Sequence, residues 1–292
     1  MDRGMAPAQG AGGQVIAARD ASLSTRDVCR HAAWAAARLA APLACVHVVE
    51  GRQARARARA PAEVLLEPGA TLLDEAALLE ASLERTGEAR GRLLLQQAAL
   101  LAGQAGDLDV RALMGHGALV DVLGALVADA ALVVMGRRGE HSEFGKTRIG
   151  SQVERVVRSV DRPLLVVPRG FAGIRTVLVA FEGSERGRRR LEWVARSPLF
   201  AGLDIRLLTV GDATARPALD QALESLAAAG LRADGRVVHG DPEEVLGQHA
   251  EAIGADLLVM GAYGRSRLRQ LLLGSTTSMV LQASRIPVLL LR

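Results

Sequence analysis

The chain has 292 residues, which is room for two domains of about 150 residues that each bury a core of their own. Hydrophobic residues make up 49% of the sequence and the formal net charge is +4, values typical of a globular protein. No run of about 18 uncharged apolar residues occurs, which excludes a membrane-spanning helix, and aromatic residues are only 2%, too few for a platform that stacks single-stranded nucleic acid.

The first half opens with a lead-in, residues 1–13, that is predicted to be disordered and lacks the apolar core of a signal peptide. The pattern then predicts strands at 14–19, 43–49, 108–114, 131–135 and 163–167, and helices at about 24–40, 72–102, 117–128 and 150–159. Residues 51–70 interrupt this order with an Arg-rich run and a short apolar patch between prolines. Cys29 and Cys45 fall in a predicted helix and a predicted strand, which favours buried thiols in a cytoplasmic protein.

The second half predicts the same order of elements with shorter connections. Strands are expected at 175–181, 204–210, 233–238, 256–260 and 287–291, and helices at about 185–196, 215–230, 242–253 and 275–284. Apolar strands that alternate with helices are typical of an α/β fold with a doubly wound parallel sheet. The sequence therefore predicts one domain at 14–169 and another at 175–292, joined by a short linker at 170–174.

The two halves are a tandem repeat. Val15 and the strand around it align with Val177 at an offset of 162, whereas Gly136 aligns with Gly261 at an offset of 125. The first half thus holds 37 additional residues between its first strand and its glycine loop, which indicates an insertion at about 51–87. A period of this length indicates two whole domains and not a solenoid of short units.

A glycine loop follows the fourth strand of each half. In the second half it reads Gly261-x2-Gly264-x9-Gly274-Ser275. Glycines let the backbone approach a ligand closely, and the N-terminus of the helix that begins near Ser275 attracts phosphate. The alternative is an ordinary surface loop with a capped helix, but the presence of a copy in each half favours a phosphate site.

The copy in the first half departs from this spacing. It reads Gly136-x2-Gly139-x10-Gly150-Ser151, one residue longer, with a glutamine where the second half has Thr276. Two glutamates in this loop would repel phosphate if they point inward. The first copy is therefore expected to bind phosphate more weakly.

This pattern resembles the universal stress protein family from about residue 13 to 292, as two family domains in tandem. The matching features are the two glycine loops, the strand end with Asp20 and Ser22, and the turn Gly240-Asp241-Pro242. The resemblance implies two five-stranded parallel sheets flanked by helices, Rossmann-like and similar to the adenine nucleotide alpha hydrolases. It also implies that the halves pack through their last strands as an internal pseudo-dimer. A homodimer of the whole chain stays open.

The resemblance further implies binding of an adenine nucleotide, ATP, ADP or AMP. The residues expected to form the site in the second half are Glu182, Ser184, His239, Gly261, Gly264, Arg265, Gly274, Ser275 and Thr276. A weaker site in the first half would use Asp20, Ser22, Gly136, Gly139, Gly150 and Ser151. Glu182 stands where the family has an Asp that helps to hold the nucleoside. His116 and His239 end the third strand of each half and either face the ligand or serve as strand-end residues.

No catalytic constellation stands out in the sequence. It lacks a Walker motif, a nucleophile elbow and the spacing of metal ligands. The expected role is therefore a regulator or sensor of stress that binds ATP or a related nucleotide, together with a protein partner whose identity the sequence does not reveal. Asp20 and Glu182 either hold Mg²⁺ through phosphate or cap a helix. Two alternatives stay open: a slow ATPase, which requires a metal and a group that activates water, and a nucleotide-free scaffold that acts through protein–protein contacts.

Overall fold

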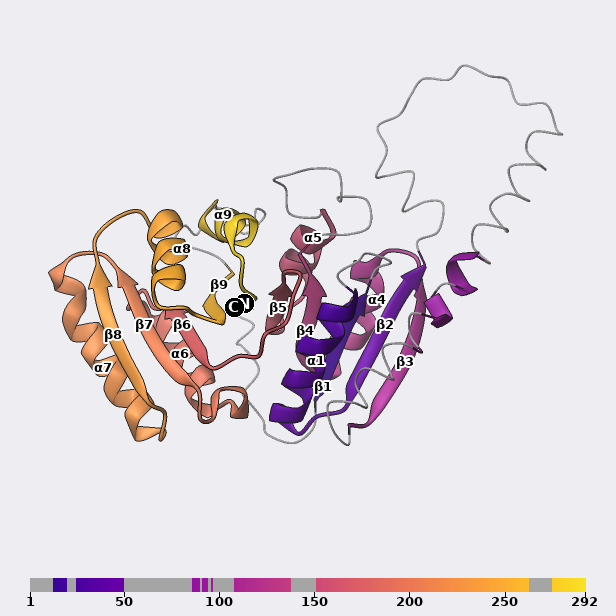
Figure 1. Cartoon of the computed structure of the whole chain (residues 1–292), viewed down its shortest axis with the longest axis horizontal. Coiled ribbons are helices and arrows are strands. Elements are labelled where there is room, and N and C mark those ends of the chain that lie inside the picture. Colours follow the sequence, from indigo (N-terminus) through magenta and orange to yellow (C-terminus); the bar gives the residue numbers. More distant parts are fainter. Residues whose placement is uncertain are drawn as a thin grey trace, which may run out of the picture.

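The structure, a computed structural model, describes residues 13–19, 25–49, 86–89, 91–93, 96, 108–137, 151–262 and 275–292. Two α/β halves lie side by side along one sheet (Figure 1). Within the described ranges, no helix is both long enough and apolar enough to cross a membrane. The loop residues 20–24, 138–150 and 263–274, and residues 51–70 of the insertion, lie outside the described residues.

The elements of the first half follow the predicted order. They are β1 (Gln14–Arg19), α1 (Thr25–Leu39), β2 (Leu43–Val49), β3 (Val110–His116), α4 (Leu119–Leu126), the 3-10 turn η1 (Val127–Asp129), β4 (Ala130–Gly136), α5 (Ser151–Ser159) and β5 (Leu164–Val167). The third strand begins two residues later than the predicted range 108–114 and ends two residues later. It lies at the edge of the sheet, where most of its side chains are partly or fully exposed and the apolar pattern is weak.

The second half repeats these elements. They are β6 (Thr176–Ala180), α6 (Glu185–Arg196), η3 (Pro198–Phe200), β7 (Asp204–Val210), η4 (Ala213–Ala215), α7 (Arg216–Ala228), β8 (Ala233–Val238), α8 (Pro242–Ala252), β9 (Leu257–Gly261), α9 (Ser275–Ala283) and β10 (Val288–Leu291). Each boundary lies within two residues of its predicted position, because the turns carry strong signals such as Pro242 after a capping Asp241.

The strands form one continuous sheet in the order β3-β2-β1-β4-β5-β10-β9-β6-β7-β8. All neighbours within a half are parallel, whereas β5 and β10 pair in antiparallel fashion with Leu165 opposite Leu289. The prediction of a five-stranded parallel sheet in each half is therefore confirmed. The prediction that the halves pair through their last strands is also confirmed, and the pairing fuses the two sheets into one.

Helices cover both faces of this sheet. Val15 and Ala17 of β1 pack in a core with α1, α6 and α7, while Ile16 and Ala18 pack in a second core with α4, α5, α8 and α9. Successive strand residues point to opposite faces, so a strand covered on both sides must be apolar throughout. Each core runs through both halves, which makes the halves one packed unit.

Arginine side chains join the two halves at the ends of helices. Arg137, directly after β4, donates to the carbonyl of Ser284 beyond α9. Arg292, directly after β10, donates to the carbonyl of Val157 in α5 and pairs with Asp161. Carbonyl groups at a helix C-terminus carry partial negative charge, so each arginine stabilises a helix end of the opposite half.

The helical residues at the end of the insertion and just after it pack on the first sheet. A Cβ atom at Gly87 would lie 3.2 Å from Val49 Cγ1, and one at Gly91 would lie 2.5 Å from His47 Cδ2. Small residues thus allow this described part of the predicted helix 72–102 to approach β2 closely. Cys29 and Cys45 are buried, as their positions predicted.

Candidate functional site

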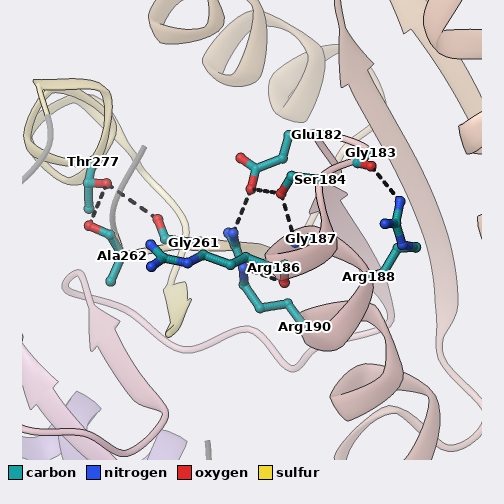
Figure 2. A network of polar contacts seen from close by, with 10 residues as sticks. All are labelled: Glu182, Gly183, Ser184, Arg186, Gly187, Arg188, Arg190, Gly261, Ala262 and Thr277. Atoms are coloured by element: carbon teal, nitrogen blue, oxygen red, sulfur yellow. Dashed lines mark hydrogen bonds and ion pairs between the residues drawn. The ribbon is translucent and has the colours of Figure 1, made fainter. Parts of the chain in front are cut away.

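The strand order of the second half reverses at β6. From β6 the chain runs outward through β7 to β8 and then crosses to β9 on the other side. Open parallel sheets bind ligands outside the carboxyl ends of their strands at such a reversal. The carboxyl ends of β6 and β9 are therefore the expected place for a ligand and are called the switch point below. Figure 2 shows a polar network that joins the start of α6 to this point.

Ser184 caps the first turn of α6. Its Oγ accepts a hydrogen bond from the backbone N–H of Gly187 at 3.0 Å. Gly183 before it adopts a positive φ of 69°, a conformation that glycine reaches without a steric penalty and that turns the chain from β6 into the helix. A helix N-terminus with its dipole therefore faces the carboxyl edge of the sheet.

Glu182 connects this cap to a cation. Its Oε1 accepts a hydrogen bond from Ser184 Oγ at 2.8 Å and forms an ion pair with Arg190 Nη2 at 2.6 Å (Figure 2). Arg190 belongs to the second turn of α6, and its side chain reaches back toward the N-terminus as helical side chains do. Only 11% of the Arg190 side chain is exposed, against 32% for Glu182, so the guanidinium lies deeper than its carboxylate.

The guanidinium of Arg190 also lies against Gly261, the last residue of β9. A Cβ atom at Gly261 would lie 2.6 Å from Arg190 Cζ and would collide with Nη1. The absence of a side chain at Gly261 therefore leaves the space that the arginine fills. One side chain thus spans the switch point, from Glu182 after β6 to Gly261 at the end of β9 (Figure 2).

Thr277 fastens the beginning of α9 to the end of β9. Its side chain is buried, and Oγ1 donates to the carbonyl of Ala262 at 3.1 Å (Figure 2). The carbonyl of Gly261 lies 3.4 Å from the same hydroxyl. The contact fixes where the helix of the glycine motif starts relative to the strand.

The other predicted residues are only partly described. Ser275 is exposed and Thr276 is partly buried in the first turn of α9, while Gly264, Arg265 and Gly274 lie outside the described residues. In the first half the structure describes Gly136 at the end of β4 and the backbone of Ser151 at the start of α5. Asp20, Ser22, Gly139 and Gly150 lie outside the described residues.

His239 lies apart from the polar network. It follows β8, two strands away from β6, which is about 10 Å at the usual strand spacing. The His239 side chain is exposed. It lies near Asp212, whose pKa is lowered mainly by a hydrogen bond from Thr214 and to a smaller extent by His239. His239 thus lies at the β7–β8 end of the sheet, away from Glu182 and Gly261.

The site expected from the sequence includes neither Arg190 nor Thr277. The position of Arg190 in its helix could have indicated that it is buried, because it lies three residues after the buried Gly187 and four before the buried Val194. This spacing places a cation on the buried face of an amphipathic helix. A charge in that position requires a partner, and Glu182 is that partner.

Among the described residues no group of three or more His, Cys, Asp or Glu side chains could hold a metal ion. The network instead offers a cation, the Ser184 hydroxyl and a helix N-terminus. Such groups suit an anionic, hydroxyl-bearing ligand, and Arg in particular suits phosphate. The residues present therefore fit a nucleotide.

Comparison with known proteins shows that both halves of the chain are similar to members of one family. The universal stress protein family matches residues 13–168 and 173–292. Universal stress protein Slr1230 of Synechocystis sp. is 33% identical over 268 residues, which cover 90% of this chain and 93% of that protein. Universal stress protein MJ0577 of Methanocaldococcus jannaschii is 36% identical over 63 residues, or 22% of this chain and 39% of that protein. A universal stress protein structure from Archaeoglobus fulgidus covers 97% of this chain and 99% of its own with a TM-score of 0.71 at 19% identity, which supports the fold.

Proposed function

Because this chain belongs to the universal stress protein family in both of its halves, we propose that it is a cytosolic protein that binds an adenine nucleotide and acts as a regulator or sensor of stress. The proposed ligand is ATP, ADP or AMP. The proposed site is the switch point of the second half, with the glycine motif that follows β9.

The polar network of Glu182, Ser184 and Arg190 against Gly261 carries this proposal. Burying charged groups costs folding free energy, so the ion pair is a poor means of stabilising the fold. Its position at the carboxyl edge of a parallel sheet, beside a helix N-terminus, favours a role in binding a polar ligand. Glu182 and Ser184 are the proposed contacts for the nucleoside. Ser275, Thr276 and the glycines 264 and 274 are the proposed contacts for the phosphates.

A binding role is favoured over hydrolysis. In the described part of the switch point the carboxylate of Glu182 is already held by Ser184 and Arg190, which disfavours its use as a base for water. A regulator that changes partners with its nucleotide state needs only the binding site.

The first experiment asks whether the purified protein carries a nucleotide. Mass spectrometry after denaturation should release AMP, ADP or ATP. Calorimetry should then show that Gly264→Val abolishes binding, because a branched side chain enters the space expected for phosphate. Gly139→Val, at the equivalent glycine of the first half, is the matched control and should leave the main binding event intact. Unchanged ATP affinity in the Gly264→Val protein would refute the proposed site.

A further inference from the structure

We propose that Arg190 makes the switch point selective for phosphorylated ligands: a nucleotide takes the guanidinium over from Glu182 and pairs it with a phosphate. The inference rests on the proposed nucleotide-binding function and adds the group that distinguishes a nucleotide from a free nucleoside. The glycine motif supplies backbone donors, and Arg190 supplies a charge that comes from α6, outside that motif.

The hydrogen bonds of the Arg190 guanidinium leave one nitrogen for a ligand. Nη2 binds Glu182, and Nε donates to the carbonyl of Arg186 at 3.1 Å. Nη1 points to Gly261, and among the described residues no acceptor binds it. A guanidinium has five N–H donors in a planar fork that matches two oxygens of a phosphate. A phosphate near Gly261 would give Nη1 its acceptor and would take Nη2 over from Glu182.

The other three arginines in the first two turns of α6 have different surroundings. Arg188 donates to the carbonyl of Gly183 at 2.8 Å, and Arg189 pairs with Glu185 at 2.6 Å, one helical turn away. Both side chains are exposed. Arg186 is exposed too and in Figure 2 extends toward the side of Gly261, which adds positive charge near the switch point. Arg190 alone among these four is largely buried there.

The ion pair with Glu182 explains how a buried arginine is kept in place before a ligand binds. The carboxylate offsets the cost of burying the guanidinium and presents it to the end of β9. A phosphate carries more charge than the carboxylate and offers three oxygens, so it competes for the same donors. Adenosine has no such group and would leave the pair intact.

The first half provides an internal comparison. At the same offset of 162 that aligns the first strands, Val28 stands where the second half has Arg190. Val28 belongs to α1 and is buried in the core that this helix shares with the sheet. The first half therefore has no arginine at this position, and any ligand there lacks this contact.

The test measures the affinities for AMP and adenosine by titration calorimetry of the full chain. Wild type should bind AMP more tightly than adenosine. Arg190→Gln should lower the affinity for AMP by about tenfold or more, because a charge-assisted contact is lost. The affinity for adenosine should stay within about twofold of the wild-type value. Arg190→Lys, which keeps the charge but not the planar fork, should lie between the two. Arg189→Gln removes the same charge from an exposed face and should behave as wild type.

Other outcomes would overturn the inference. If Arg190→Gln raises the affinity for both ligands, the arginine merely blocks the site. If it changes neither affinity, the arginine only balances the charge of Glu182. Equal affinity of wild type for AMP and adenosine also contradicts selectivity. A wild-type protein that binds none of AMP, adenosine and ATP refutes the proposed function together with this inference. The outcomes above, in which a ligand does bind, refute the inference alone.

A second variant keeps the test valid if loss of the cation unfolds the protein. Gly261→Ala retains the Glu182 and Arg190 side chains, but its Cβ would collide with Nη1 and displace the guanidinium from the end of β9. The displaced atoms belong to the far end of a flexible side chain, so the fold should persist. The same selective loss of AMP affinity is expected, and unchanged selectivity would contradict the proposal.

Discussion

Thr277 shows what a single hydroxyl contributes at the residue scale. Its side chain is 2% exposed, and Oγ1 donates to the carbonyl of Ala262 at the end of β9. In the first half the aligned residue is Val153, which is also buried and has the same shape without the donor. The second half alone therefore has this tie between the strand and the helix of its glycine motif.

Thr277→Val should lower the free energy of unfolding by about 1–2 kcal/mol, because it leaves a buried carbonyl without this donor while conserving volume. Urea unfolding followed by circular dichroism measures the change. Thr276→Val, one residue earlier and less buried, is the control and should change stability by less than about 0.5 kcal/mol. Equal effects of the two substitutions would show that the hydrogen bond to Ala262 contributes little.

The residues of the proposed site differ in how far the sequence could predict their positions. Gly261 and Ser184 lie at fixed spacing in a strand-loop-helix pattern, and the structure places them at the expected strand and helix ends. Arg190 owes its position to two strands that are distant in sequence, since Glu182 follows β6 and Gly261 ends β9. A motif read along the chain cannot report a contact that exists only when β6 and β9 lie side by side.

At the scale of elements, α1 meets the connection between the halves through a buried histidine. His31 Nδ1 lies 2.7 Å from the carbonyl of Asp27, which can only accept, so Nδ1 carries the proton and Nε2 does not in the neutral ring. The ring packs edge-on against Phe171, with centroids 4.7 Å apart. Burial lowers the pKa of His31 below its ordinary value, and the smaller opposing effects of Asp27 do not restore it.

Acid should therefore destabilise the protein in the range where the unfolded histidine titrates. The unfolded chain takes up a proton near its ordinary pKa of about 6.5, whereas the folded ring does so only at lower pH, so unfolding binds protons in between. The melting temperature should fall between about pH 7 and the lower folded-state pKa. Burial, with the nearby Arg236 as the next cause, also lowers the pKa of His249, so His31→Gln should remove part of this slope.

Differential scanning fluorimetry across this range measures the slope. A His31→Gln protein whose melting temperature falls with pH as steeply as that of wild type would show that His31 does not couple protonation to unfolding.

Most elements of the fold were predictable, because apolar strands, capped helices and Gly or Pro turns agree along the chain. The exceptions are instructive. The strand Val110–His116 lies at the sheet edge with a weak apolar pattern, and its range shifted. The arginines that join the halves, Arg137 and Arg292, lie next to strand ends and contact helices more than 130 residues away in sequence. Such contacts follow from the antiparallel pairing of β5 with β10 and not from any local pattern.

At the scale of the whole molecule, the two halves share a sheet and two cores but differ at their switch points. The glycine loop of the first half is one residue longer and carries two glutamates. Val28 and Val153 stand there in place of Arg190 and Thr277. The two valines remove a cation and a donor from the first half, and the glutamates add negative charge beside its loop, so the tandem repeat should hold two unequal sites.

Titration of the full chain should therefore give a stoichiometry closer to about one nucleotide per chain than to two, at concentrations close to the dissociation constant of the tighter site. Phosphate affinity depends on donors and cations within reach, and the second half holds more of both. Two tight sites of equal affinity in the wild-type chain would show that neither the spacing of the glycine loop nor the arginine of α6 controls binding.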